Sequence, residues 1–483
     1  LMSTCSRRDL LFASIAAAAL PLSGAKPEPR TETKAPNILY ILLDDLGTDL
    51  GSYGGTSVET PNLDRLAREG MRFTQAYSGC SVCAPARSTL LTGTHMGHTP
   101  VRRNSGGVSL QADTYTVAEM LAGAGYRCGG FGKWGVGDLD TPGVPEKHGF
   151  SKFFGYYHQV HAHFFFPDYL IDTGRKVPLP GNKGTYAQPN DALPPGPVRM
   201  TTESGQRRQF SQYLIFEEMK KFLREDRQQP FFCYAPWTVP HGRFHIPEDD
   251  TAWQMYKDKP WSIEARVYAA FVTMSDRMVG EVLDLLDELG VAENTVIFFS
   301  SDNGAAAAYP ELKSPGKLRG GKTSMYEGGL RIPFIVRWPG KITAGSESDL
   351  PVYFPDFLPT VAAIAGIEPT VPHELDGESY LPELLGELRL TRDRKMYWEW
   401  NKDHFAEYTV YMQAHRDGKW KLVRNDPNKP WELYDLAEDP SEVNDLASLH
   451  PDRVAAMEAW IHANRVDPFP QVEPDKTEGQ RWR

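Results

Sequence analysis

The stretch Asn37-Ile38-Leu39-Tyr40-Ile41-Leu42-Leu43, which is followed at once by Asp44-Asp45, decides the fold class of this chain. The run contains no charged residue, whereas a strand with one solvated face would alternate apolar and polar residues. It therefore predicts a strand that is buried on both faces. Comparable apolar runs recur at residues 230–237, 295–301 and 333–338. Several such strands are typical of a parallel sheet that lies between two layers of helices.

Helical patterns separate these predicted strands. The clearest pattern covers residues 266–289, where apolar residues recur with the period of a helix and Gly290 marks the end. Strands that alternate with helices predict an α/β fold with a large mixed, mostly parallel sheet flanked by helices.

The C-terminal part of the chain follows a different pattern. From about residue 366 onward the apolar segments are short, as at residues 420–423 and 432–434. These segments predict an antiparallel sheet, and residues 451–465 predict a closing helix. We therefore expect a main α/β domain over residues 36–365 and a smaller C-terminal α+β subdomain over residues 366–483.

The N-terminal residues predict an export signal. Arg7 and Arg8 precede an apolar run at residues 10–22, and small residues follow at 23–25. This order is typical of a cleavable signal peptide, here residues 1–25, and the run is short for a membrane span. The stretch around the two arginines resembles a twin-arginine signal. We therefore expect the twin-arginine export machinery as a partner, a periplasmic or extracellular location, and no stable membrane span. A plain secretory signal is the alternative.

Composition narrows the function classes. The 483 residues include 41% hydrophobic and 24% charged residues, which are ordinary values for a globular protein. The formal net charge of −11 argues against nucleic acid as a partner. Removal of Cys5 with the signal would leave Cys80, Cys83, Cys128 and Cys233, which are too few for a disulfide scaffold. We interpret all of these except Cys83 as packing residues.

Polar residues follow the predicted strands, where ligands of open α/β sheets bind. Asp44-Asp45 follows the first run, Pro240-His241 follows another, and Asp302-Asn303 follows the run at 295–301. Three carboxylates and an amide oxygen at one sheet edge form a hard, oxygen-rich site, which Ca²⁺ or Mg²⁺ prefers to zinc. Taken singly, an acidic pair could be solvated, and Asp302-Asn303-Gly304 could be a turn.

A second motif is Cys83-Ala84-Pro85-Ala86-Arg87, which is followed by Ser-Thr-Leu-Leu-Thr-Gly at residues 88–93. Pro85 suits a first helical position, so Cys83 should lie at or just before a helix N-terminus. Free N–H groups and the helix dipole there favour an anion and should lower the pKa of the thiol. The alternative is a cysteine that merely caps a packed helix.

The Cys-x-Pro-x-Arg motif with its trailing Leu-Thr-Gly resembles the signature of type I sulfatases, in the alkaline phosphatase superfamily. Further motifs fall in the order of that family: Asp44-Asp45, Gly132-Lys133-Trp134, Pro240-His241, Asp302-Asn303-Gly304, Gly321-Lys322 through Glu327-Gly328-Gly329, and Trp431 to Leu436. The resemblance runs from about Pro36 to the end of the chain. It implies that residues 36–365 form a catalytic domain with an alkaline phosphatase-like fold.

The resemblance also implies a chemistry. In that family a formylglycine-generating maturation enzyme oxidises the cysteine to formylglycine (3-oxoalanine), whose hydrated gem-diol is the nucleophile. Here this residue would form from Cys83, supported by Arg87. One Ca²⁺ ion would be held by Asp44, Asp45, Asp302, Asn303 and an oxygen of modified Cys83. Lys133, His241 and Lys322 would surround the sulfate and balance the charge that develops as the S–O bond breaks.

Two positions depart from the family pattern. The commoner form of the third motif has a histidine two residues after the lysine, where this chain has Gly135, and Ala86 replaces a frequent serine. We hypothesise that His163, in Gln159-Val160-His161-Ala162-His163, supplies the missing imidazole. The alternative is a histidine that contacts the sugar or packs beneath the aromatic residues at 164–166.

The expected function is therefore hydrolysis of a sulfuric ester. An aromatic region at residues 156–169, with Trp237 and Trp261, could form a platform for a sugar ring or could pack in the core. We favour a sulfated carbohydrate as substrate, with aryl sulfates also accepted. The alternatives are a phosphonate monoester or phosphodiester hydrolase of the same superfamily and a non-catalytic, exported sugar-binding relative.

Overall fold

A computed structural model of the chain describes residues 35–183, 194–225, 228–306, 309–313, 318–387, 393–400 and 411–467. The chain from Ala35 onward forms one compact unit. The expected signal peptide at residues 1–25 lies outside the described residues. Within the described ranges, no helix is both long and apolar enough to cross a membrane.

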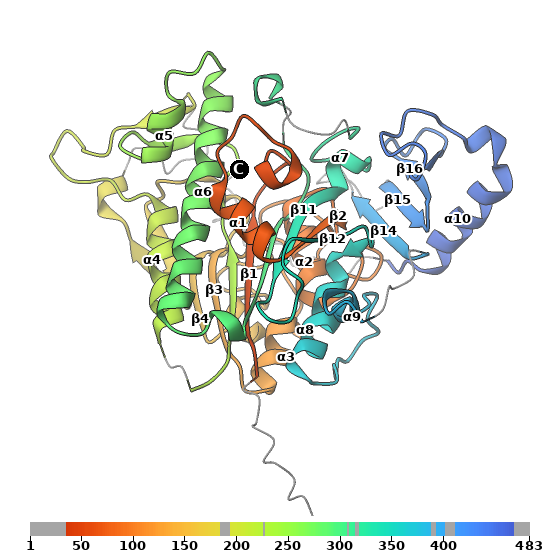
Figure 1. Ribbon diagram of the computed structural model, residues 1–483, viewed down its shortest axis with the longest axis horizontal. Coiled ribbons are helices and arrows are strands. Elements are labelled where there is room, and N and C mark those ends of the chain that lie inside the picture. The colour runs from red at the N-terminus through yellow and green to blue at the C-terminus, as the bar shows by residue number, and fades with distance from the viewer. Residues whose placement is uncertain are drawn as a thin grey trace, which may run out of the picture. The chain divides into compact units, whose positions relative to one another are not determined.

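A large mixed sheet forms the centre of the molecule (Figure 1). Its strands are β1 (Asn37–Leu43), β2 (Met71–Tyr77), β3 (Arg127–Lys133), β4 (Lys152–Tyr156), β5 (Tyr169–Asp172), β6 (Arg175–Pro178), β8 (Phe231–Pro236), β10 (Thr295–Ser301), β11 (Arg331–Arg337), β12 (Ser346–Ser348) and β13 (Val352–Tyr353). They lie in the order β12-β2-β11-β10-β1-β8-β3-β4-β5-β6, and β13 also pairs with β2. A separate two-stranded sheet joins β7 (Gly196–Val198) to β9 (His245–Pro247).

The strand β1 is parallel to both of its neighbours, β8 and β10. The strand β3 is parallel to β8 and to β4, whereas β11 runs antiparallel to β10 and to β2. The register pairs Leu43 with Ser301, the last residues of β1 and β10. These central parallel strands therefore end at the same edge of the sheet.

Both faces of β1 are buried, as its uninterrupted apolar sequence predicts. Ile38, Tyr40 and Leu42 join one buried cluster, and the alternate residues join a second cluster on the opposite face. The first cluster includes residues of α2 (Cys83–Thr92), α3 (Val117–Gly123) and α8 (Phe357–Ala365). The second includes residues of α1 (Pro61–Glu69), α4 (Ser211–Arg224), α5 (Thr251–Tyr256) and α6 (Ile263–Glu288). The predicted α/β class is confirmed.

The long helix α6 begins at Ile263 rather than at Arg266, where its apolar stripe suggested a start. Ser262 is the N-cap, and its side chain accepts a hydrogen bond from the backbone N–H of Ala265. Gly290 follows the helix with φ 67°, a left-handed conformation that suits glycine. The end was therefore predicted more closely than the start.

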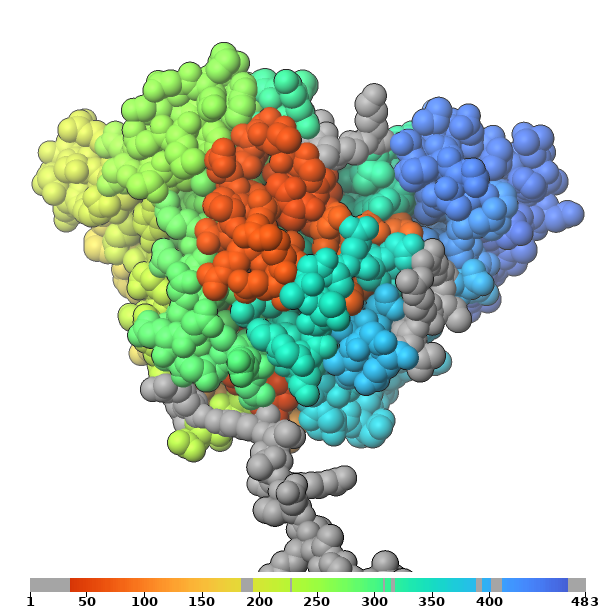
Figure 2. Space-filling model, in the orientation of Figure 1, coloured from red at the N-terminus to blue at the C-terminus, as the bar shows by residue number. Residues whose placement is uncertain are grey.

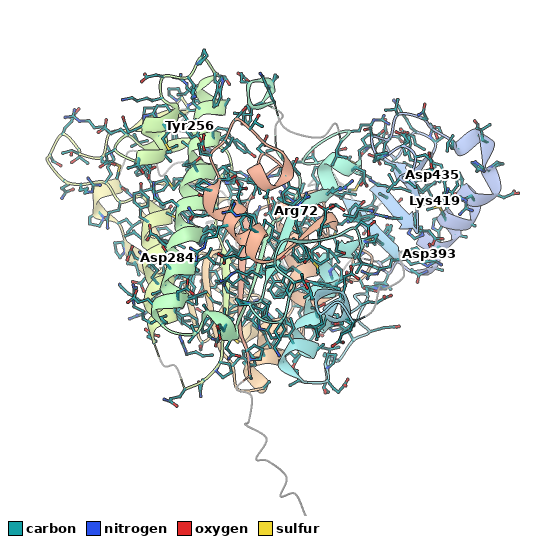
Figure 3. The ribbon with its side chains drawn as sticks, in the orientation of Figure 1. Arg72, Tyr256, Asp284, Asp393, Lys419 and Asp435 are labelled. Carbon is teal, nitrogen blue, oxygen red and sulfur yellow. The ribbon has the colours of Figure 1, made fainter. Side chains whose placement is uncertain are left out.

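A smaller antiparallel sheet follows in the chain, as predicted for the C-terminal part. It contains β14 (Lys395–Trp400), β15 (Met412–Asp417), β16 (Trp420–Arg424) and β17 (Glu432–Asp435), and α10 (Pro451–Ala463) packs on it. Figure 2 shows these elements in blue at one side of the molecule. In Figure 3, Lys419 and Asp435 lie beside each other at this sheet, where they form a partly buried ion pair at 2.5 Å. The proposed boundary at residues 365 and 366 stays a prediction.

The small sheet is joined to the large domain by a buried charged cluster. Lys421 Nζ lies 2.8 Å from Glu327 Oε1 and 2.9 Å from Glu442 Oε1, and all three side chains are buried. Glu327 is the first residue of the short helix α7 (Glu327–Leu330), and Tyr77 on β2 donates a hydrogen bond to it. The small sheet therefore supports the segment that precedes and includes α7. The remaining α-helix of the described residues is α9 (Leu381–Leu384).

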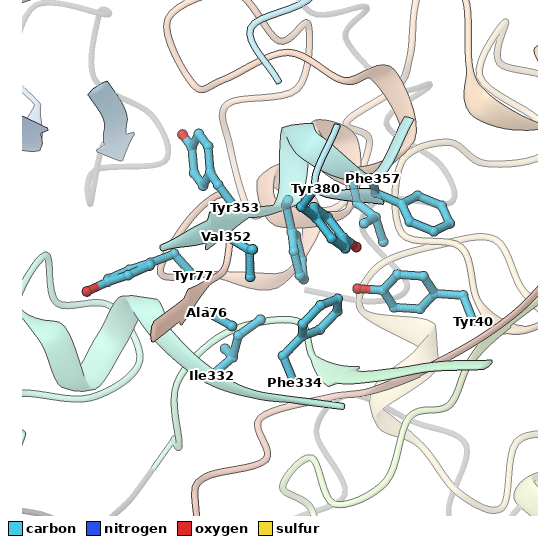
Figure 4. Close-up of a pocket in the computed structure, with 11 residues that line it drawn as sticks. Tyr40, Ala76, Tyr77, Ile332, Phe334, Val352, Tyr353, Phe357 and Tyr380 are labelled. Carbon is cyan, nitrogen blue, oxygen red and sulfur yellow. The ribbon is translucent and has the colours of Figure 1, made fainter. Parts of the chain in front are cut away.

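One enclosed hollow lies within the apolar core (Figure 4). Its lining is aromatic and aliphatic and includes Tyr40, Phe334, Tyr353 and Tyr380, and its accessible volume is about 10 Å³. The lining contains no ionisable group except tyrosine hydroxyls. This hollow is a packing gap and holds none of the residues predicted to be functional.

The packing of His415 predicts how the stability of this fold depends on pH. Burial lowers the pKa of His415 to about 4, and its ring stacks on Trp460 of α10 with centroids 4.1 Å apart. Because the folded-state pKa is below the ordinary value of 6.5, His415 contributes stability that is lost as pH falls from 6.5 toward 4. We expect His415→Phe, which keeps the stack, to reduce the stability lost between about pH 7 and about pH 5 by about 2 kcal/mol.

Urea unfolding at each pH measures this loss. His462→Phe is the control. It replaces an exposed histidine on α10, the helix of Trp460, and should leave the pH dependence of wild type unchanged. Parallel stability curves for wild type and His415→Phe would contradict the assignment of a neutral, buried imidazole.

Candidate active site

The carboxyl ends of the parallel strands bring the predicted polar residues together. Asp44 and Asp45 follow β1, Asp302 and Asn303 follow β10, and Lys133 is the last residue of β3. The N–H of Asp302 donates to the carbonyl oxygen of Leu43 at 2.9 Å, and the N–H of Asp45 donates to Asp302 Oδ1 at 3.2 Å. The two acidic segments are therefore held against each other by the sheet register.

Cys83 is the first residue of α2, as its motif predicts, although Pro85 is the third helical residue rather than the first. Every residue of α2 is buried, so the helix points its N-terminus into the sheet edge from within the core. Cys83 Sγ lies 3.2 Å from Asp44 Oδ1 and 3.3 Å from Lys322 Nζ. The sulfur atom is thus enclosed between a carboxylate and an ammonium group.

Three cations neutralise the three carboxylates of this site. Lys133 Nζ lies 2.6 Å from Asp44 Oδ2, and Lys322 Nζ lies 2.7 Å from Asp45 Oδ1. Arg87 donates to Asp302 Oδ2 from two of its nitrogens, at 2.9 and 3.1 Å, and also to the backbone carbonyl of Lys133. Such pairing is required because an unpaired charge buried at this depth costs several kcal/mol.

The pairing also sets the carboxyl pKa values. Burial opposes ionisation of Asp44, but Lys133, His241 and Arg87 outweigh it and hold the pKa of Asp44 well below its usual range. Burial and the neighbouring charge of Asp44 raise the pKa of Asp302 to about 7. Within this cluster, Asp44 therefore carries the more firmly fixed negative charge.

The prediction of a lowered thiol pKa at Cys83 was wrong. Burial, and then the charges of Asp302 and Asp44, raise the pKa of Cys83 well above its ordinary value. The N-terminus of α2 does act on this residue, but desolvation and two carboxylates outweigh it. Cys83 as a thiol is therefore a weak nucleophile at neutral pH.

Two imidazole rings form one wall of the site. The rings of His163 and His241 are stacked, with centroids 3.9 Å apart and planes 16° apart. His241 Nε2 lies 3.5 Å from Asp45 Oδ2, and His163 Nε2 lies 3.5 Å from Lys133 Nζ. Burial, and then Lys322, lower the pKa of His241 to about 4, and burial, His241 and Lys133 hold the pKa of His163 well below its ordinary value. Both rings are neutral at physiological pH.

The donor atoms of the site suit a hard cation. Single ligand atoms of Asp44, Asp45, Cys83 and His241 all lie within 4.8 Å of one another. Asn303 is fully buried, and its Nδ2 donates to Asp45 Oδ1 at 2.7 Å while its Oδ1 has no hydrogen-bond partner among the described residues. A buried carbonyl oxygen without a partner is costly unless a cation or another group occupies the space in front of it. The carboxylates and this amide oxygen therefore fit Ca²⁺.

A second group of possible metal ligands is held together by its own polar contacts. His95, His98 and Asp376 also place ligand atoms within 4.8 Å. The N–H of Gly97 donates to His95 Nδ1 at 3.0 Å, so the proton of a neutral His95 ring is on Nε2. Nε2 faces Asp376 at 3.5 Å, and His98 Nδ1 lies 2.9 Å from the same carboxylate. These contacts place two imidazoles against one carboxylate.

Gly135 occupies a conformation that the sequence pattern did not reveal. Its φ is 77°, and a Cβ atom at this position would lie 2.6 Å from Gln159 Oε1 and 3.5 Å from Arg87 Cδ. The space that a side chain would need is therefore already filled by Gln159. The residues Gln159 and Asn104, which lie beside the start of α2, were not predicted as site residues. The occurrence of Gln159 in the same short segment as His163 was the sequence signal for Gln159, and Asn104 had none.

The aromatic residues considered as a sugar platform are mostly core residues. Phe164, Phe165, Phe166 and Trp237 are buried, and Trp261 is partly buried against Tyr256. Two partly exposed aromatic side chains lie outside this run: the rings of Tyr309 and Phe244 are 6.4 Å apart. Core packing is therefore the role that burial supports for residues 164–166.

The fold and the site define an α/β protein with a buried cluster of carboxylates, cations and one cysteine at the carboxyl edge of its sheet. The family model for sulfatases matches residues 36–367, and a model for the C-terminal part of N-sulphoglucosamine sulphohydrolase matches residues 321–462. The chain belongs to the sulfatase family, the sulfuric ester hydrolases, with the alkaline phosphatase-like fold that its motifs implied.

Characterised relatives agree with this membership. The N-acetylgalactosamine-6-sulfatase of Homo sapiens is 34% identical to the chain over 383 residues, which cover 75% of this chain and 67% of the relative. Arylsulfatase A of Homo sapiens is 33% identical over 449 residues, covering 85% and 83%. The solved structure of Ps i-CgsB in complex with k-i-k-neocarrahexaose has a TM-score of 0.74 at 26% identity, covering 93% of this chain and 97% of that chain.

The environment of Gly135 generates a test of stability. We expect Gly135→Ala to be more destabilising than Gly205→Ala, which also has φ 77° but has no atom within 4 Å of the added Cβ. The control should cost roughly 1–2 kcal/mol for its left-handed conformation alone. Gly135→Ala should cost roughly 1–3 kcal/mol more, because its Cβ displaces Gln159. Urea unfolding of the two variants measures the difference. Equal losses of unfolding free energy would show that the side chain of Gln159 moves aside without a measurable cost.

Proposed function

We propose that this protein is an exported sulfatase that releases inorganic sulfate from a sulfated carbohydrate, with a formylglycine formed from Cys83 and one bound Ca²⁺ ion. The observation that carries the proposal is the enclosure of Cys83 between Asp44 and Lys322 at the N-terminus of α2. A small anion that reaches residue 83 would meet Lys133, Lys322 and His241 around the same point. This arrangement suits the transfer of a sulfuryl group to a side chain at position 83.

The charge balance of the site supports a bound divalent cation. Asp44, Asp45 and Asp302 are matched by Lys133, Lys322 and Arg87, so the side chains alone attract an anion weakly. Asp44, Asp45, Asp302, Asn303 and an oxygen of modified Cys83 would hold the ion. Bound Ca²⁺ would supply Lewis-acid polarisation and two positive charges, which give the site a net attraction for a sulfate ester.

The raised pKa of Cys83 supports the need for maturation. A buried thiol that stays protonated is a poor nucleophile, and a thiol provides no easy route for release of sulfate. The hydrated aldehyde of formylglycine would supply a hydroxyl nucleophile, and sulfate would leave as the aldehyde reforms. A formylglycine-generating maturation enzyme is therefore the expected partner.

The remaining side chains have separate roles in this proposal. Arg87 is fully buried and bridges Asp302 to the backbone of Lys133, so it would orient residue 83 and support its hydroxyl groups. Lys133 and Lys322 would bind the sulfate oxygens, and His241 would stabilise the charge on the bridging oxygen. Each of these groups is held by at least one neighbour before substrate arrives, which reduces the cost of ordering the site.

The substrate class follows from the relatives. The name of N-acetylgalactosamine-6-sulfatase describes action on a sulfated sugar, and the Ps i-CgsB complex contains k-i-k-neocarrahexaose. A sulfated carbohydrate is therefore the preferred substrate, and aryl sulfates are convenient probes. The proposal keeps a catalytic domain at residues 36–365, a C-terminal subdomain at 366–483, and export by the twin-arginine route to the periplasm or the exterior.

The first experiment produces the protein together with a formylglycine-generating enzyme and measures the mass of the peptide that contains residue 83. We expect the loss that corresponds to conversion of the thiol to an aldehyde, together with release of sulfate from 4-nitrophenyl sulfate. Cys83→Ala should reduce turnover at least about 100-fold, and EDTA should abolish turnover until Ca²⁺ is restored.

The other outcomes identify the alternatives. Faster turnover of bis(4-nitrophenyl) phosphate than of the aryl sulfate would favour a phosphodiesterase. Calcium-dependent binding of sulfated sugars without turnover, by fully modified protein, would favour a sugar-binding relative. An unmodified thiol after coexpression would overturn the proposed nucleophile.

We propose in addition that His163 replaces the histidine that is missing at position 135. His163 Nε2 lies 3.5 Å from Lys133 Nζ, and the ring packs on His241, so it faces the same space as the predicted sulfate ligands. A low pKa keeps the ring neutral and able to accept a proton at Nε2. Its buried neighbour His161 packs instead against Tyr156 and Tyr169.

We expect His163→Gln to lower kcat for 4-nitrophenyl sulfate by about 100- to 1,000-fold, the usual contribution of a general acid or base. The content of formylglycine and the unfolding temperature should match those of wild type. Turnover within a few-fold of wild type would show that His163 only packs beneath the site.

A further inference from the structure

The start of helix α2 receives no side-chain cap from its own N-cap residue. The N-cap residue is Val82, whose side chain has no oxygen to accept from the free N–H groups of the first turn. Pro85 has no N–H, and Ala86 N–H donates to the carbonyl oxygen of Val82 at 3.2 Å. The N–H of Ala84 therefore needs an acceptor from another segment of the chain.

Asn104 provides that acceptor. Its Oδ1 accepts from Ala84 N–H at 2.9 Å and also from Gln159 Nε2 at 3.1 Å. Because both donors meet the same oxygen, the orientation of the Asn104 amide is determined. Gln159 is thus connected to the residue next to Cys83 through one intervening side chain.

Gln159 itself is held in place by the shape of its surroundings. The residue is only 3% exposed, and its Oε1 lies 2.6 Å from the position that a Cβ at residue 135 would occupy. The same Oε1 has no hydrogen-bond partner among the described residues, so a buried carbonyl points into a niche that borders Gly135 and the stem of Arg87. The niche exists because residue 135 is glycine.

We propose that Gln159 is a positioning residue for the nucleophile. It fills the space that Gly135 leaves and, through Asn104, fixes the first turn of α2, which begins with residue 83. The inference rests on the proposed function, since the placement of residue 83 matters for turnover only if that residue attacks the substrate.

The test uses fully modified protein and 4-nitrophenyl sulfate. Gln159→Met and Asn104→Ala should each lower kcat by about 10- to 100-fold and change KM by less than about threefold, because they displace the nucleophile rather than the sulfate ligands. The double variant should lose no more than the more damaging single variant, since both break one chain of hydrogen bonds. Gln212→Met is the matched control, because Gln212 is a buried glutamine of α4 whose Oε1 also lacks a partner within the part of the chain that the structure describes.

A second readout does not depend on turnover. Hydrogen exchange in peptides that cover the start of α2 should be faster in Gln159→Met and Asn104→Ala than in wild type or Gln212→Met. Additive losses of kcat, kcat within about threefold of wild type in Gln159→Met, or unchanged exchange at the start of α2 would each overturn the inference. An inactive, fully modified wild type with altered exchange in the variants would refute the proposed function while leaving the positioning role in place.

Discussion

The parallel register of β1 and β10 is the constraint on which the active site depends. It pairs Leu43 with Ser301 and allows the N–H of Asp302 to bond to the carbonyl oxygen of Leu43. The acidic residues that follow the two strands must then share one small, buried space. Three carboxylates in such a space repel one another and lose hydration, so the arrangement is stable only if cations are brought to the same point. Because the sheet brings the three carboxylates together, other elements of the fold must place positively charged side chains beside them.

Each cation comes from a different part of the chain, so the ion pairs of the site hold several elements of the fold together. Lys133 ends β3, Arg87 extends from α2, and Lys322 precedes α7. The segment with Lys322 is anchored in turn by Glu327, which meets Lys421 and Glu442 in the buried cluster beneath the small sheet. The C-terminal sheet therefore contributes to the site without placing any side chain in the cluster of carboxylates and cations described here. Loss of one partner would leave an unpaired charge, so the elements that surround the site are coupled energetically.

The sequence predicted the parts that local patterns determine. Uninterrupted apolar runs located β1 and β10 with their correct ends, and the order of motifs identified the residues that meet at the sheet edge. The start of α6 was placed too late because a capping serine, rather than the apolar stripe, sets it. The pKa of Cys83 was predicted in the wrong direction because a sequence shows the helix N-terminus but not the burial and the two carboxylates that outweigh it. Asn104 and Gln159 were missed because their contacts join segments that no local pattern connects.

The change from histidine to glycine at position 135 illustrates why a missing residue cannot be interpreted alone. The left-handed backbone of Gly135 and the side chain of Gln159 disfavour any larger residue there, so the absent histidine is part of a different local structure. One short segment provides both Gln159, which fills the niche beside Gly135, and His163, which reaches Lys133. A single 3₁₀ turn at residues 161–163 sets the spacing between the two side chains. The segment therefore acts as one unit, because the positions of Gln159 and His163 depend on the same stretch of backbone.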